Sequence, residues 1–420
     1  MVHSPCVRRA VASCNFEAMA TGVPQEPEPQ APAISHHIGT ILYYLQNYRI
    51  VVVSAAPGSG KSTVLPRYLA NYGFGPVICA QPRLFAVTVA SSKPGQERES
   101  DDVWFTTTRV LIDMLCCNRR PAFVAAFRTI VVDEAHDRTL CTNLLLRVVK
   151  AAVATEEMGH LNVVVCTAGG PEDSSLSDFF FGAPIVAFQR AVHPVAVHYS
   201  RGPMLDMVSA VVEEVTDIHR SKPPGDVLVF LPDIIRILEA YEKLEQLDLP
   251  GLVLCLIHDN LPKEFMDHAL DPAPGGSRKV VLATDVAETA VLVPGITYVV
   301  DTGVLSEDPL AMVSKEAAIR RAAVAGTAFA GHCHRLYMEG EYAGFQEHTV
   351  PHVKRDGGAL NKLALMLKRH AADGMPGFEL LDPPVAPSLE NVVAELVTSG
   401  YLDKHGKLTE KGKREAYDED

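Results

Sequence analysis

The residues best suited to chemistry form a glycine-rich segment that carries a lysine and two hydroxyl side chains. It reads Ala55-Ala56-Pro57-Gly58-Ser59-Gly60-Lys61-Ser62-Thr63 and directly follows the β-branched run Ile50-Val51-Val52-Val53. Glycines allow backbone N–H groups to face phosphate oxygens, and the N-terminus of a following helix favours negative charge. Lys61 would contact the β- and γ-phosphates, while the Ser62 hydroxyl would ligate Mg²⁺. The pattern predicts that residues 57–63 bind a nucleoside triphosphate; the alternative is a chance glycine-rich turn.

Two adjacent carboxylates follow a second apolar run, in the segment Val131-Val132-Asp133-Glu134-Ala135-His136. Beside a phosphate loop, one carboxylate holds the metal ion and the other orients or deprotonates the attacking water. Alone, such a pair is usually a solvated strand end. Together with the phosphate loop it indicates an NTPase, in which one of the carboxylates of Asp133 and Glu134 shares Mg²⁺ with Ser62 and the other acts on the water.

The elements that must position these residues are short apolar strands alternating with helices. The expected strands are 50–53, 77–79, 129–132 and 163–165, then 227–230, 253–256, 280–282 and 298–300, with helical spacing at 111–115 and 140–149. This alternation is typical of βαβ units around a parallel sheet. We therefore predict an α/β fold with two halves that meet near residues 190–205. A last helix should begin after a capping Ser388 and end at Gly400.

The composition agrees with a folded chain of more than one domain. At 420 residues, 47% hydrophobic and 21% charged, two or three domains are expected. No apolar run reaches the roughly 18–20 residues of a membrane span, so no membrane partner is expected. Nine cysteines without a C-x-x-C pair favour a reducing compartment over a disulfide framework. The formal charge of −13 argues against nucleic acid on average, although one groove can still be basic.

Several further segments, taken in order, resemble the DEAH-box RNA helicases of helicase superfamily 2. The resemblance centres on Asp133-Glu134-Ala135-His136 and extends from about His36 to Lys413. The other matching segments are Gln81-Pro82-Arg83 (motif Ia), Thr107-Thr108-Arg109-Val110-Leu111 (motif Ib), Thr167-Ala168-Gly169 (in place of Ser-Ala-Thr), 225–231 (motif IV), 278–289 (motif V), Asp301-Thr302-Gly303, and 378–384, which is similar to the entry to a winged helix.

The resemblance implies two tandem RecA-like P-loop NTPase lobes, with ATP and Mg²⁺ between them and single-stranded RNA across both. It divides the chain into a tail and linker (1–35), an ATP-binding lobe (36–195), a helicase C-terminal lobe (196–373) and a partial winged helix (374–420). By position, Arg83, Thr107 and Thr284 would contact the RNA backbone, although on physical grounds Arg83 is equally well a surface arginine. Many members of the family work in the nucleus, so a nuclear location is expected for this chain. The cytoplasm and the mitochondrion are alternative locations.

The main departure from the family lies in motif VI, which usually reads Gln-Arg-x-Gly-Arg-x-Gly-Arg. In the aligned stretch 320–327, Arg320 replaces the water-positioning glutamine, and Val324 and Thr327 replace the two arginine fingers. Only Arg321 keeps its place and stays a catalytic candidate. Because an arginine finger contributes roughly 10³–10⁵ in turnover in related enzymes, we expect nucleotide binding with weakened hydrolysis. Partial substitution by Arg320 is an alternative.

Other departures point the same way. Leu84 replaces an arginine usual after motif Ia, the stretch 87–103 is short, and the strand-separating hairpin between Gly303 and motif VI is mostly missing. The chain also ends just inside the winged helix, before the family's RNA-clamping domains. A zinc site at 332–334 (His-Cys-His) is not expected, because consecutive strand residues point to opposite faces.

Three interpretations follow from these matches and departures. The first is an ATP-dependent RNA helicase or RNA-stimulated ATPase, divergent and slow, with an activating protein partner left open. The second is a nucleotide-binding pseudo-helicase that acts as a scaffold or regulatory module without efficient turnover. The third is an incomplete or duplicated gene without a stable product.

Overall fold

The structure is a computed structural model whose described residues form two separate units. It describes residues 33–83, 86–87, 102–116, 126–154, 159–170, 172–189, 193–258, 268–289, 293–307, 310–349, 357–369, 380–381 and 389–416. One unit combines residues 32–190 with 350–420, and the other spans 191–349. We call residues 33–189 lobe 1, residues 193–349 lobe 2, and residues 357–416 the C-terminal helices. The predicted tail up to residue 32, Leu84 and Ser388 lie outside the described residues.

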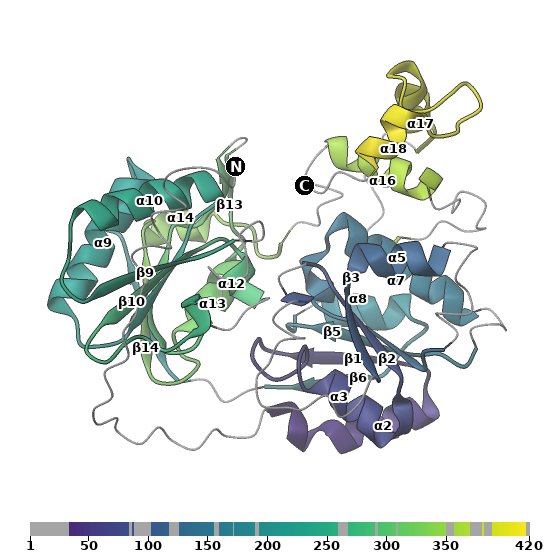
Figure 1. Ribbon diagram of the computed structural model, residues 1–420, viewed down its shortest axis with the longest axis horizontal. Coiled ribbons are helices and arrows are strands. Elements are labelled where there is room, and N and C mark those ends of the chain that lie inside the picture. Colours follow the sequence, from purple (N-terminus) through teal and green to yellow (C-terminus); the bar gives the residue numbers. More distant parts are fainter. Residues whose placement is uncertain are drawn as a thin grey trace. The chain divides into compact units, whose positions relative to one another are not determined.

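Lobe 1 is a six-stranded parallel sheet in the order β3-β2-β4-β5-β1-β6 (Figure 1). Its strands are β1 (Ile50–Ala55), β2 (Val77–Gln81), β3 (Val103–Thr107), β4 (Thr129–Val132), β5 (Asn162–Thr167) and β6 (Ile185–Phe188). Alternate residues of the central strands join two different apolar clusters, which is why these strands are apolar throughout. One cluster includes α5 (Thr108–Cys116), α7 (Leu140–Ala154) and α8 (Glu172–Phe179); the other includes η1 (Ala33–His36), α2 (Ile38–Asn47) and α3 (Leu65–Leu69).

Lobe 2 is a second six-stranded parallel sheet, in the order β7-β14-β11-β8-β10-β9. Its strands are β7 (Val195–Tyr199), β8 (Asp226–Phe230), β9 (Leu252–Ile257), β10 (Arg278–Ala283), β11 (Ile296–Asp301) and β14 (Gly331–Arg335). The helices are α9 (Met207–Ser221), α10 (Ile234–Gln246), α12 (Val286–Thr289), α13 (Lys315–Val324) and α14 (Glu339–Ala343). Side chains cap three of them at the N-terminus, because Asp206, Asp233 and Ser314 accept backbone N–H groups of α9, α10 and α13.

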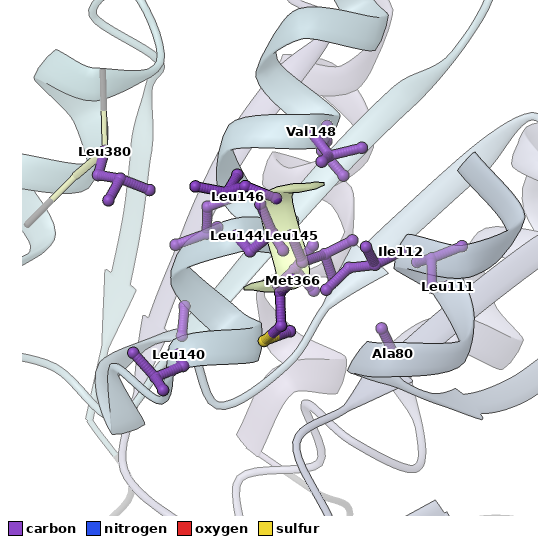
Figure 2. Packing of buried hydrophobic residues seen from close by; sticks show 14 of the residues in the cluster. Ala80, Leu111, Ile112, Leu140, Leu144, Leu145, Leu146, Val148, Met366 and Leu380 are labelled. Atoms are coloured by element: carbon purple, nitrogen blue, oxygen red, sulfur yellow. The ribbon is translucent and has the colours of Figure 1, made fainter. Parts of the chain in front are cut away.

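The C-terminal helices α16 (Gly357–Arg369), α17 (Leu389–Thr398) and α18 (Glu410–Glu415) pack on lobe 1. Figure 2 shows Met366 of α16 among Leu144 and Leu145 of α7, and these residues belong to one buried cluster. Two polar contacts accompany this packing: Arg109 donates to the carbonyl of Ala416, and Arg369 lies 3.6 Å from Asp113. The helix α16 also contacts α17 and α18. The predicted domain boundaries at 195/196 and 373/374 stay predictions.

The predicted fold class is confirmed, since both halves are parallel sheets flanked by helices. Every strand expected from an apolar run is present, whereas β3, β6 and β7 were not expected. A short antiparallel hairpin, β12 (Val304–Glu307) with β13 (Leu310–Met312), stands where the longer hairpin of the family is mostly missing. Within the described residues, no helix is both long and apolar enough to cross a membrane.

Candidate nucleotide site

The phosphate loop has the conformation that its glycines predict. After β1 ends at Ala55, Gly58 and Gly60 adopt φ angles of 74° and 100°, a region that side chains with a Cβ disfavour. The carbonyl of Gly60 accepts the amide of Val64 at 2.9 Å, a helical bond, so the chain turns directly into α3. The predicted order of strand, loop and helix is confirmed.

Lys61 and Ser59 are polar groups whose present surroundings fit a bound phosphate. Lys61 is 3% exposed, and its Nζ donates to the carbonyls of Ala55 and Ala56, the latter at 3.1 Å. The Ser59 hydroxyl is fully buried and has no hydrogen-bond partner in the described part of the chain. A cation held only by neutral carbonyls and an unused buried hydroxyl both gain from an anionic ligand. Ser62 and Thr63 are partly exposed beside them.

Asp133 is positioned by a glutamine that the sequence did not reveal. Its Oδ2 accepts Gln81 Nε2 at 2.8 Å, and its Oδ1 accepts the backbone N–H of Glu134 at 3.0 Å. Gln81 is the last residue of β2 and Asp133 follows β4, and these two strands pair directly. In the sequence, Gln81 belongs to the helicase-like segment Gln81-Pro82-Arg83, but a functional role was predicted only for Arg83.

Glu134 and His136 connect the carboxylate pair to the segment Thr167-Ala168-Gly169. Glu134 has a positive φ of 51°, rare for a residue other than glycine, and is buried. His136 Nε2 lies 3.2 Å from Glu134 Oε2, and His136 Nδ1 accepts the amide of Ala168 at 3.1 Å. Because Nδ1 accepts a hydrogen bond, the neutral ring carries its proton on Nε2, facing Glu134.

The sheet brings the phosphate loop and the carboxylates to the same edge. β5 lies between β1, which leads into the loop, and β4, which leads into Asp133. The thiol of Cys166 in β5 interacts electrostatically with both groups. Burial and then Asp133 raise the pKa of this thiol, whereas Lys61 lowers it. The carboxyl edge of a parallel sheet is where α/β proteins bind ligands. Lys61, Asp133 and Glu134 therefore follow neighbouring strands at one edge of the sheet, whereas their catalytic roles and magnesium binding by Ser62 and Asp133 stay predictions.

The residues predicted to contact RNA have other contacts in the structure. Arg83 Nε lies 3.8 Å from Asp137, the Thr107 hydroxyl accepts the amide of Val110 in α5, and Thr284 is buried at the end of β10. Their assignment to RNA stays a prediction. No group of three or more histidine, cysteine or acidic residues in the described ranges is arranged to hold a metal ion. Cys333 is buried while His332 and His334 are half-buried, as strand alternation predicts.

In lobe 2, the two motif VI arginines are engaged by carboxylates of the same lobe. Arg321 is 1% exposed and donates to Glu288 at 3.2 Å and to Asp301 at 2.9 Å, with its guanidinium 4.7 Å from the Phe230 ring centre. Burial works against its charge, but Asp301 and Glu288 outweigh it and raise the pKa of Arg321. Arg320 donates to Glu288 at 2.8 Å and lies 3.1 Å from Glu316.

The positions of the two missing arginine fingers carry structural contacts instead. Val324 is 5% exposed at the end of α13, and the Thr327 hydroxyl donates to its carbonyl at 2.9 Å. The intervening Gly326 is tightly enclosed, since a Cβ there would lie 2.5 Å from the carbonyl oxygen of His193. Residues 324–327 thus form a packed helix end.

The fold and the phosphate loop of lobe 1 are those of the P-loop NTPase class, and lobe 2 is a second RecA-like lobe. The comparisons show which proteins of this class the chain is similar to. The helicase conserved C-terminal domain matches residues 208–321. A probable ATP-dependent RNA helicase, the DHX35 homolog of Caenorhabditis elegans, is 31% identical in an alignment that includes 88% of this chain. The chain spans about half of that relative, 56% of its length.

A solved structure shares the fold. The DEAH/RHA helicase HrpB of Escherichia coli matches with a TM-score of 0.79 and 23% identity, over 91% of this chain and 52% of HrpB. At this identity the match shows the fold alone. The sequence relative bears out the resemblance that the motifs indicated, since the chain is similar to a DEAH-box-type RNA helicase over most of its length.

Proposed function

We propose that the chain is an ATP-dependent RNA helicase-like protein that binds ATP–Mg²⁺ through lobe 1. The observation that carries this proposal is the arrangement of Lys61, Asp133 and Glu134 at one edge of the lobe 1 sheet. Lys61 would leave its own loop carbonyls for the phosphates, and the Ser59 hydroxyl and the loop amides would donate hydrogen bonds to the remaining phosphate oxygens. Bound Mg²⁺ would neutralise phosphate charge, held by the Ser62 hydroxyl and Asp133.

Glu134 is the residue proposed to act on the attacking water. Its carboxylate is buried, and His136 Nε2 lies 3.2 Å from one of its oxygens, a contact that would favour one orientation of the carboxylate. Gln81 fixes Asp133 in the same way. This half of the site is therefore preorganised for hydrolysis, and such preorganisation lowers the cost of reaching the transition state.

A second candidate function, a nucleotide-binding pseudo-helicase, is favoured by the motif VI geometry. Transition-state charge on the γ-phosphate needs a mobile or well-aimed arginine. Arg320 and Arg321 instead bind Glu288, Glu316 and Asp301 within their own lobe. Under this candidate, ATP turnover is weak and the chain acts through binding, as a scaffold or regulator.

Binding of single-stranded RNA, an activating protein partner and a nuclear location are parts of the same proposal. The support for RNA is the relationship to RNA helicases, together with the positions of Arg83, Thr107 and Thr284. With a net charge of −13, RNA binding by the chain should be weak by the standards of basic proteins.

The first experiment measures the affinity of the chain for a fluorescent ADP in the presence of Mg²⁺. Lys61→Ala should weaken binding about 10- to 100-fold, because a charge-assisted contact to phosphate is lost. Lys411→Ala, the same substitution at an exposed position of α18, is the control and should bind normally. Equal affinity of the native chain and Lys61→Ala would contradict the assignment of the phosphate loop.

The second experiment separates the two candidates by steady-state ATP hydrolysis, with and without single-stranded RNA. The native chain is compared with the double variant Val324→Arg, Thr327→Arg, after both are shown to be folded by circular dichroism. Turnover that is negligible in the native chain and rises in the double variant supports the pseudo-helicase. RNA-stimulated hydrolysis in the native chain, without a gain in the double variant, supports the enzyme.

A further inference from the structure

An aspartate outside the helicase motifs joins the two strands on which the nucleotide site depends. Asp173 in α8 accepts the Ser54 hydroxyl on Oδ2 at 2.5 Å and the Thr167 hydroxyl on Oδ1 at 3.0 Å. Ser54 in β1 and Thr167 in β5 are register partners in the sheet. One carboxylate therefore ties neighbouring strands together at their carboxyl ends, directly before the phosphate loop and the segment 167–169.

The contacts of Asp173 are of the strong kind. Both hydroxyls belong to buried residues, so each depends on a protein acceptor rather than water. Hydrogen bonds to an ionised carboxylate are roughly twice as strong as neutral ones. Each carboxylate oxygen accepts a hydroxyl from a different strand, so a shift of either strand would break one of the two hydrogen bonds.

From Thr167 the contacts continue to the carboxylate that is proposed to act on water. The Thr167 hydroxyl accepts the amide of Gly169 at 3.0 Å, and in the same turn the amide of Ala168, the residue between them, donates to His136 Nδ1 at 3.1 Å. His136 in turn lies against Glu134. Gly169 has a φ of 93° and passes close to Ser54, since a Cβ at this glycine would lie 3.4 Å from the Ser54 oxygen. The phosphate loop and Glu134 are thus linked through Asp173.

We propose that Asp173 is a positioning residue of the nucleotide site, which holds β1 and residues 167–169 in one arrangement. Through Ser54 it fixes the entry to the phosphate loop, and through Thr167 it fixes the turn that orients His136 and Glu134. The inference rests on the proposed function, because it names a residue that serves the same nucleotide. Asp173 itself makes no contact with the nucleotide and transfers no proton.

The test compares Asp173→Ala with Asp178→Ala, the same change at an exposed position of the same helix. Affinity for fluorescent ADP with Mg²⁺ should fall about tenfold in Asp173→Ala, as expected from losing two charge-assisted bonds that position the loop. Asp178→Ala should bind like the native chain. Asp173→Asn, which keeps the shape and one acceptor oxygen, should lie between them.

A double-mutant comparison distinguishes positioning from general loss of stability. If Asp173 acts through the hydroxyls, Ser54→Ala with Thr167→Val should reproduce the loss, and adding Asp173→Ala should weaken binding by less than twofold more. Additive losses would overturn the proposal. Should Asp173→Ala fail to fold, the Ser54→Ala, Thr167→Val pair tests the same link with the carboxylate in place.

Hydrogen exchange of the nucleotide-free chain gives a second measurement that needs no ligand. Asp173→Ala should speed exchange in peptides covering both 50–60 and 162–170, severalfold in each, while lobe 2 peptides are unchanged. Faster exchange confined to α8 would overturn the proposal. If neither the native chain nor Lys61→Ala binds nucleotide, the proposed function fails, whereas normal binding by Asp173→Ala with weak binding by Lys61→Ala refutes only the role of Asp173.

Discussion

Lobe 1 and lobe 2 have the same architecture, but their buried cations have different partners. In lobe 1, Lys61 donates to the carbonyls of Ala55 and Ala56, and the buried Ser59 hydroxyl has no hydrogen-bond partner among the residues that the structure describes. In lobe 2, Arg321 is held between two buried carboxylates, and Arg320 shares one of them. The first lobe keeps groups available for a ligand, whereas the second uses its cations to hold its own helices together.

The largest effect is expected from breaking the buried ion pairs of lobe 2. Arg321→Met leaves Glu288 and Asp301 buried without their cation, which should cost about 3–5 kcal/mol of unfolding free energy. Denaturant unfolding combined with hydrogen exchange of lobe 2 peptides measures this loss separately from lobe 1. A loss below about 1 kcal/mol would show that Arg321 is not a structural cation.

A comparable test in the other unit concerns the apolar contact of the C-terminal helices with lobe 1. Leu363→Ala, at a fully buried position of α16, should cost about 2–5 kcal/mol, because a cavity opens beside the helices of lobe 1. Exchange should quicken in peptides of α7 and not in those of lobe 2. Leu310→Ala, at a leucine that is 71% exposed on β13, is the control and should change stability little.

A smaller effect is expected for Arg320→Gln, which restores the glutamine usual at this position. Arg320 is partly exposed, with 15% of its side chain open to solvent, so losing its pairs with Glu288 and Glu316 should cost about 1 kcal/mol. Because the arginine fingers are still missing, ATP turnover should not rise. A tenfold gain in turnover from this single change would mean that Arg320 alone blocks catalysis.

The smallest effect concerns the pH dependence of lobe 2. Burial, followed by His334, His332 and Lys222, lowers the pKa of His198, while Glu214 opposes this. The folded lobe then binds this proton more weakly than the unfolded chain, so the stability from neutral His198 is full above the unfolded pKa of about 6.5 and is lost as pH falls below it. In His198→Gln, unfolding free energy should depend less on pH between about 7.5 and 5.5. An unchanged slope would contradict this.

The sequence predicted the local parts of the site well, because strand, glycine turn and lysine are neighbours in the chain. The loop at residues 57–63 and the strand before Asp133 needed no knowledge of distant contacts. The same reasoning explains the correct strand alternation at His332-Cys333-His334, where Cys333 alone is fully buried. The assignment of RNA contacts to Arg83, Thr107 and Thr284 came from the family resemblance and stays a prediction.

Contacts between distant segments could not be predicted in this way. Gln81 reaches Asp133 because β2 and β4 are neighbours in the sheet, and Asp173 reaches Ser54 because α8 begins near the ends of β1 and β5. Glu288 binds Arg320 and Arg321 because α12 and α13 are in contact in the folded lobe, and this contact cannot be read from the sequence. Hydrogen bonds such as these depend on sheet order, which a single sequence does not contain.

The return of the C-terminal helices to lobe 1 makes lobe 2 an insertion within a discontinuous unit. Among the described residues, apolar side chains of 357–416 join the buried cluster that includes α5 and α7 of lobe 1. Lobe 2, by contrast, begins and ends within 191–349 and has its own buried cluster. The fragment 193–349 should therefore be soluble when expressed alone, whereas 33–189 should require 357–416, supplied either in the same chain or as a separate fragment.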